Sequence, residues 1–221
     1  MNKLTISDLV NTFSESQEKN QNDRMEKLHL SQLAICGFKY RHELETNKKI
    51  PFSWKFLRGI AIEDAIWNSI RKTDNTYVHN PTIQIADNIT GSPDFISIDK
   101  SHIIELKSSK NEKYKDIYER QLKAYMWFYT LQENKEFSGS LWMYNTIYDT
   151  MNSIGEYEHL TEIDIKIIKN SIESFTDNEY KEGIENSLCA FCDNLECPVN
   201  KKAKKDENIP HKRTDENGWK V

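Results

Sequence analysis

Two carboxylates and a lysine stand in and beside what otherwise reads as a buried strand of this 221-residue chain. The stretch GSPDFISIDKSHIIELKSS, residues 91–109, places Asp94 before one apolar run and both Glu105 and Lys107 inside the next. Burying an unpaired charge costs several kcal/mol, so such groups are usually paired or bound to a metal. Because side chains alternate along a strand, Glu105 and Lys107 are expected to share one face.

Asp94 lies beside Glu105 if the two strands pair through the turn at residues 99–101. Adjacent carboxylates repel one another unless a cation lies between them, and oxygen ligands of this kind suit Mg²⁺ or Mn²⁺. Such a cation orients a phosphodiester, acidifies a water and stabilises developing charge. A plainer alternative is an exposed strand edge with a Glu/Lys pair, because the spacing Asp-x(10)-Glu-x-Lys is common on its own.

Segments with helical or strand-like periodicity flank this stretch, and they must position its charged side chains. Gln121 and Tyr125 are four apart in the predicted helix 114–133, so they share a face, and Glu63, four residues after Gly59, offers a third carboxylate. Gln121 and Tyr125 also suit a plain polar edge on a core helix. Further helices are predicted from Ser31 through Tyr40, over 53–72 and, after a Thr161–Asp164 capping box, through Phe175; strands are predicted at 82–87, 93–99, 102–108 and 138–149. The turn residues of NITG join the strands 82–87 and 93–99, and with 102–108 these form a three-strand meander. This order predicts an α/β (α+β) fold, with a small mixed sheet flanked by helices.

The four cysteines have the spacing of a metal centre. Cys36 stands alone, whereas Cys189, Cys192 and Cys197 form a C-x2-C-x4-C cluster. In a reducing compartment such a cluster favours metal ligation over disulfides. Four thiolates satisfy a structural zinc site, and their spacing does not separate zinc from a 4Fe–4S cluster.

The composition is that of a globular protein with a well-hydrated surface. Hydrophobic residues make up 37% of the chain, charged residues 29%, and the net charge is −5. The bulk charge therefore gives no sign of a nucleic-acid partner, although a local basic groove suffices for one. No apolar run reaches transmembrane length and no secretory signal precedes the first helix, so we expect a cytoplasmic protein with no membrane partner.

The motifs together resemble a known family of nucleases. GSPDF and IIELKSS, followed by QLKAY, are similar to the PD-(D/E)xK nucleases of the RecB type, including their Gln-xxx-Tyr motif. LSQLAICGFKY and CAFCDNLECP resemble the iron–sulfur members of that superfamily, above all the CRISPR-associated RecB-like exonucleases used in spacer acquisition. The resemblance runs from Ser31 to Pro198, which is most of the chain.

That resemblance implies a restriction-endonuclease-like fold whose two chain ends form a helical iron–sulfur lobe. It implies a metal-dependent DNA exonuclease acting on single strands or frayed ends. The implied metal ligands are Asp94, Glu105 and the Leu106 carbonyl, and the implied catalytic lysine is Lys107. The resemblance also implies that Gln121 and Tyr125 position the DNA strand. The implied ligands of the 4Fe–4S cluster are Cys36, Cys189, Cys192 and Cys197. The chain departs from the family at Glu63, where a metal-binding histidine is common, and a carboxylate there can also bind Mg²⁺ or Mn²⁺.

The resemblance also divides the chain. Residues 1–30 are predicted to form a helix and a polar connection, 31–198 the nuclease domain, and 199–221 a polar basic tail, with the cluster lobe built from about 31–50 and 160–198. The expected partners are DNA and CRISPR adaptation or recombination proteins; the sequence predicts no oligomeric state. One alternative is a phage or mobile-element recombination or replication nuclease of the same fold. Another is a catalytically idle iron–sulfur DNA-binding module, against which the intact Asp94, Glu105 and Lys107 argue.

Overall fold

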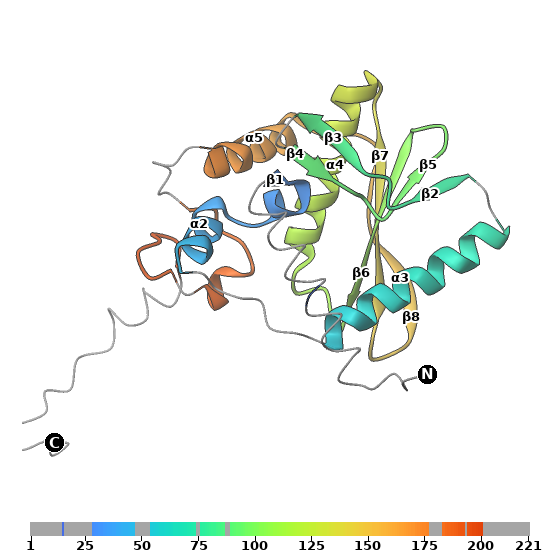
Figure 1. The fold of residues 1–221 in the computed structure, drawn as a ribbon, viewed down its shortest axis with the longest axis horizontal. Coiled ribbons are helices and arrows are strands. Elements are labelled where there is room, and N and C mark those ends of the chain that lie inside the picture. The colour runs from blue at the N-terminus through green and yellow to red at the C-terminus, as the bar shows by residue number, and fades with distance from the viewer. Residues whose placement is uncertain are drawn as a thin grey trace, which may run out of the picture.

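A five-stranded sheet is formed by the middle part of the chain. The structure is a computed structural model, and it describes residues 15, 28–46, 54–73, 76–86, 89–176, 183–192 and 194–200. The strands of the sheet lie in the spatial order β2 (Tyr77–His79), β5 (Phe95–Ser97), β6 (His102–Ser109), β7 (Ser138–Asn145) and β8 (Thr150–Tyr157). The β6–β7 pair is parallel, and the other three pairs are antiparallel. The predicted mixed sheet is therefore confirmed (Figure 1).

β6 and β7 form the centre of the sheet. They pair over their whole length, from His102 opposite Ser138 to Ser109 opposite Asn145. A parallel pair needs a long crossover connection, which here is the helix α4 (Lys115–Glu133). α4 ends at Asn134, whose φ of 49° is the left-handed conformation that often follows a helix. The helix predicted at 114–133 is thus confirmed within one residue.

The region predicted as one strand, 138–149, is the first half of a hairpin. β7 ends at Asn145, whose side-chain oxygen accepts the backbone N–H groups of Ile147 and Tyr148 and so holds the turn into β8. β8 was not predicted because its sequence, TMNSIGEY, is mostly polar. As an edge strand it gains its hydrogen bonds from β7 and needs little apolar surface of its own.

A second, three-stranded sheet corrects the predicted meander. It contains β1 (Leu28–His29), β4 (Ile89–Gly91) and β3 (Ile83–Ala86), in that order. The prediction that 82–87 pairs with 93–99 is wrong, because β3 pairs with β4, and β2 takes the place beside β5. The last three residues of the turn expected at NITG, 89–91, are the strand β4 instead. A Cβ added to Gly91 would come within 2.9 Å of Leu30 and Tyr125, so only glycine allows this close approach.

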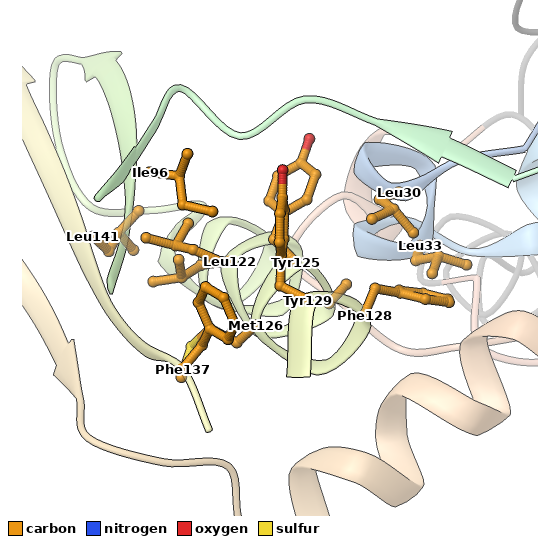
Figure 2. Close-up of a cluster of buried hydrophobic side chains, with 12 residues drawn as sticks. Leu30, Leu33, Ile96, Leu122, Tyr125, Met126, Phe128, Tyr129, Phe137 and Leu141 are labelled. Atoms are coloured by element: carbon orange, nitrogen blue, oxygen red, sulfur yellow. The ribbon is translucent and has the colours of Figure 1, made fainter. Parts of the chain in front are cut away.

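Helices cover the two faces of the larger sheet. α3 (Trp54–Thr73) packs its apolar stripe against the face that carries Phe95, Ile104 and Leu106. α4 covers the opposite face, where Leu122 and the other side chains of one buried cluster meet the sheet. Figure 2 shows this cluster, with the sheet residues Ile96 and Leu141 at one side and Leu30 and Leu33 at the other; its members are Leu30, Leu33, Ile96, Ile103, Leu122, Ala124, Tyr125, Met126, Phe128, Tyr129, Phe137 and Leu141.

The early and late parts of the chain lie side by side next to α4 (Figure 1). They contain the 3₁₀ helix η1 (Leu30–Ala34), α2 (Gly37–Glu45), α5 (Glu162–Thr176) and the 3₁₀ helix η2 (Cys189–Phe191). The single helix predicted from Ser31 through Tyr40 is wrong, because the chain bends at Ile35 between η1 and α2. At the start of α2, the Gly37 N–H donates to Ser174 Oγ at 3.2 Å. A Cβ on Gly37 would meet the Ser174 backbone at 2.2 Å, so glycine lets α2 and α5 touch.

The α5 capping box is confirmed, because the Thr161 and Asp164 side chains each accept the other residue's backbone N–H. The helix predicted near residues 3–20, apart from Glu15, and the tail beyond Asn200 lie outside the described residues. Among the helices that are described, none is both long enough and apolar enough to span a bilayer.

Candidate active site and cysteine centre

Asp94 lies next to Glu105, as the predicted pairing of their strands requires. Phe95 pairs with Ile104 in the antiparallel β5–β6 ladder, so the residue before β5 meets the continuation of β6. There Asp94 Oδ2 accepts the backbone N–H of Leu106 at 2.6 Å. The Asp94 carbonyl also accepts the backbone N–H of Asn80 at 2.9 Å. Backbone N–H groups thus hold both the carboxylate and the main chain of Asp94.

Glu105 is buried in the sheet with one oxygen unsatisfied. Its side chain is 1% exposed, and its Oε1 forms an ion pair with Lys107 Nζ on the same face of β6. Its Oε2 is buried and has no hydrogen-bond partner among the described residues. A buried oxygen without a partner is costly, and functional sites are where such atoms are expected.

The charges in this cluster act strongly on one another. Burial raises the pKa of Asp94 well above its ordinary value, and the neighbouring charge of Glu105 raises it further, while Lys107 opposes both. Burial also raises the pKa of Glu105. Burial alone lowers the pKa of Lys107, but the two carboxylates outweigh it, so that pKa is raised and the ammonium stays charged.

This arrangement fits a divalent cation. The Lys107 ammonium now provides the positive charge beside Glu105, and the free Oε2 leaves a second acceptor for a cation. Oxygen donors of this kind are the ligands that Mg²⁺ and Mn²⁺ prefer. Within the described residues, however, no group of three or more His, Cys, Asp or Glu side chains could hold a metal ion in its present arrangement.

Gln121 and Tyr125 reach the same site from α4. Tyr125 is buried and donates its hydroxyl to the Ser92 carbonyl at 3.0 Å, two residues before Asp94. Gln121 Nε2 donates to Tyr125 Oη at 3.5 Å, which is the predicted sharing of one helix face. Burial raises the pKa of Tyr125, and the charge of Glu105 raises it further, so the phenol stays protonated beside the carboxylates.

Glu63 approaches the site from α3 but has partners of its own. Its Oε1 lies 2.8 Å from His79 Nε2 and accepts from Asn80 Nδ2 at 2.8 Å. Its charge contributes to the raised pKa of both Asp94 and Glu105, so it lies close to them. Sequence reasoning missed His79 and Asn80 because His79 ends β2, a short edge strand with no metal-ligand spacing, and Asn80 directly follows it.

Leu106, whose carbonyl is a predicted ligand, lies beside Asp94 through its backbone. In an antiparallel hydrogen-bonded pair, the N–H and C=O of one residue point to the same side. Since the Leu106 N–H reaches Asp94, its carbonyl is directed to that side too.

The four cysteines gather around one small cavity in the part of the chain beside α4. Cys36 lines it at the start of α2, and Cys189, Cys192 and Cys197 line it from η2 and the loop that follows. All four are buried and carry free thiols. Burial raises the pKa of Cys192 and Cys197, and the nearby Lys39 opposes this for Cys192. The four cysteines thus line one cavity, although no three of them, within the described residues, are arranged to hold a metal ion as they stand.

Hydrogen bonds from backbone N–H groups and from one asparagine side chain shape the loop that carries these cysteines. The backbone N–H of Ile184 donates to Cys36 Sγ at 3.2 Å, and that of Asn186 to Cys189 Sγ at 3.4 Å. Asn200 is buried and donates to the Cys192 carbonyl at 3.2 Å. N–H donors to sulfur are an arrangement that stabilises metal-bound thiolates.

Comparisons with solved structures agree with this fold. The protein SSO0001 aligns with a TM-score of 0.57 and 18% sequence identity, over 86% of this chain and 97% of that one. An alkaline exonuclease from Laribacter hongkongensis aligns with a TM-score of 0.50 and 15% identity, over 72% of this chain and 90% of that one. The chain shares their fold. No protein-family model and no curated protein sequence matches it.

Proposed function

We propose that this chain is a divalent-metal-dependent DNA nuclease that removes nucleotides from single-stranded or frayed ends. The observation that carries the proposal is the Asp94–Glu105–Lys107 cluster on adjoining strands, in which Glu105 is buried and one of its oxygens has no partner among the described residues. The fold shared with an alkaline exonuclease supports the same class of reaction.

In this proposal the carboxylates hold the cation. Asp94 and Glu105 bind it directly with the Leu106 carbonyl, and Glu63 supplies a third carboxylate at the outer side. When bound, the cation orients the phosphate, acidifies a water and offsets the charge that develops on the phosphate oxygens. Because Lys107 occupies Glu105 Oε1, the cation would be held at Glu105 Oε2, which has no partner among the described residues.

The chain's own residues then align the reactants. Lys107 holds the attacking water or the phosphate oxygen, while a phosphorus–oxygen bond to the leaving nucleotide breaks as the new one forms. Tyr125 and Gln121 position Lys107 and the DNA strand from α4. Tyr125 also fixes the loop before Asp94 through its hydrogen bond to Ser92.

The four cysteines are proposed to hold a 4Fe–4S cluster that joins the two ends of the domain. The single cavity that they line supports one shared metal centre. Zinc is the competing occupant, because four thiolates satisfy it equally well. The sequence resemblance supports a role in CRISPR spacer acquisition with adaptation proteins; a phage or mobile-element recombination role uses the same chemistry.

The nuclease proposal is tested with end-labelled single-stranded, blunt duplex and frayed duplex DNA in Mn²⁺ or Mg²⁺, with and without EDTA. We expect single strands and frayed ends to be shortened progressively, and EDTA to stop the reaction. Glu105→Gln protein, purified in the same way, controls for contaminating nucleases. Intact DNA in both metals would leave the idle DNA-binding module as the better reading.

A further inference from the structure

Arg120 is a half-buried cation on α4. Its Nη1 atom is buried and has no hydrogen-bond partner among the described residues. An arginine remains charged even when it is partly buried, and a buried donor without a partner costs free energy. The position one residue before Gln121 therefore carries a cost that needs a reason.

The neighbours of Arg120 belong to the cysteine centre. Burial lowers the pKa of its guanidinium, whereas Asp116, Cys36 and Cys189 raise it, which places two of the four sulfur atoms near this charge. Asp116 lies one helical turn earlier on α4. Its two oxygens accept the backbone N–H and the hydroxyl of Ser187 at 3.0 and 2.7 Å, so it also joins α4 to the cysteine loop.

A metal centre with four cysteine ligands is the complement that this site lacks. Metal binding displaces the thiol protons, and both zinc and a 4Fe–4S cluster with four thiolates carry a net negative charge. We propose that Arg120 is a positioning residue whose guanidinium balances the anionic metal–thiolate centre and fastens that centre to α4. The inference rests on the proposed metal centre and does not depend on the identity of the metal.

This role joins the two sites through a single helix. Asp116 binds the cysteine loop through Ser187, Arg120 lies one helical turn later, and the next residue, Gln121, belongs to the candidate active site. With the metal bound, the charge of Arg120 is balanced and the first two turns of α4 are held. Without it, the partly buried guanidinium loses this counter-charge and these turns are held less firmly.

The test compares Arg120→Met with wild type in two forms, metal-loaded and stripped by a chelator under reducing conditions. Thermal unfolding and the half-time of metal loss to EDTA are measured for each, with iron and zinc quantified. Arg120→Met should release the metal at least about tenfold faster, as expected for a lost outer contact, and lower the unfolding midpoint of the loaded form by a few degrees. In the stripped form it should leave the midpoint unchanged or raise it. Arg120→Lys, which keeps the charge, should restore most of the metal retention, and Arg71→Met, on the exposed end of α3, should change neither measurement.

Two results would overturn the inference, and they differ. If Arg120→Met lowers both midpoints equally and leaves metal release unchanged, the side chain acts by packing alone and the metal centre stands. If wild-type protein contains neither iron nor zinc and binds neither on reconstitution, the metal centre and the inference fail together. DNA cleavage does not enter the measurement, so either result leaves the nuclease proposal independent.

Discussion

The carboxylate site and the cysteine centre lie along the same helix but are built in opposite ways. Asp94, Glu105 and Lys107 belong to paired strands, where ladder register and backbone hydrogen bonds fix their positions. Cys189, Cys192 and Cys197 belong to a region whose one regular element is the three-residue η2, within the described residues 183–192 and 194–200. The sheet can hold its charged groups in place before any ion arrives. The loop depends on what binds to it.

The first way to break this comparison is to remove the charges that the sheet holds. Asp94→Asn, Glu105→Gln and Lys107→Met should each lower DNA cleavage by at least about 10³-fold, with near-native circular dichroism, because the groups act as one unit around the cation. Double variants should be little worse than single ones. Glu133→Gln, a carboxylate paired with Lys100 at the surface, is the control and should cleave normally. Near wild-type cleavage by Glu105→Gln would show that the site has been wrongly placed.

Removing one cysteine tests the other half of the comparison. Cys36→Ser should abolish the brown colour and lower the thermal midpoint by roughly 10 °C, because the centre closes a loop worth about 4–5 kcal/mol in the chain-entropy model. Cleavage at low temperature should survive in part, since the carboxylates keep their strands. The measurement is absorbance, metal content and calorimetry on the same anaerobic preparation. Colourless wild-type protein with zinc and no iron would exclude the cluster and leave the cross-link intact.

Glu63 is an intermediate case between the carboxylates on paired strands and the cysteines on a loop, because a helix carries it. Glu63→Gln should raise the Mn²⁺ concentration needed for half-maximal cleavage about tenfold, with little change in maximal rate, as expected for an outer ligand. Asp64→Asn, the exposed neighbour on α3, is the matched control. Superimposable Mn²⁺ titrations of wild type and Glu63→Gln would eliminate the ligand role.

The smallest effect concerns pH. Folding raises the pKa of the Asp94 and Glu105 carboxyl groups above their unfolded values of 3.8 and 4.5. The stability that each protonated group provides is therefore complete below its unfolded pKa and is lost as the pH rises through its folded pKa. Without divalent cations, Glu105→Gln should therefore gain stability over wild type, by a few degrees, between pH 5 and about pH 8. Adding Mn²⁺ should reverse the ranking at the upper end. Parallel unfolding curves for the two proteins over this range would contradict the raised pKa.

Local patterns predicted the groups that carry chemistry better than they predicted the pairing of strands. Alternation placed Glu105 with Lys107, and helical spacing placed Gln121 with Tyr125, because both depend on one element only. The partners of Glu63 could not be predicted, since His79 lies on a three-residue strand that exists through its pairing with β5. Arg120 was missed for a related reason. Its burial beside the cysteines follows from how the chain ends pack against α4, which has no local period.

The wide separation of Cys36 from the other cysteines has a consequence for biosynthesis. About 160 residues must be translated after Cys36 before Cys197 exists, which at ordinary rates takes roughly 10 to 30 s. Both strands of the central β6–β7 pair are synthesised within that interval, whereas the proposed metal centre must wait for its last ligand. A metal bound there would mark a chain that has been made through Cys197, and a ribosome that stops earlier leaves the central sheet without that cross-link between the early and late parts of the chain.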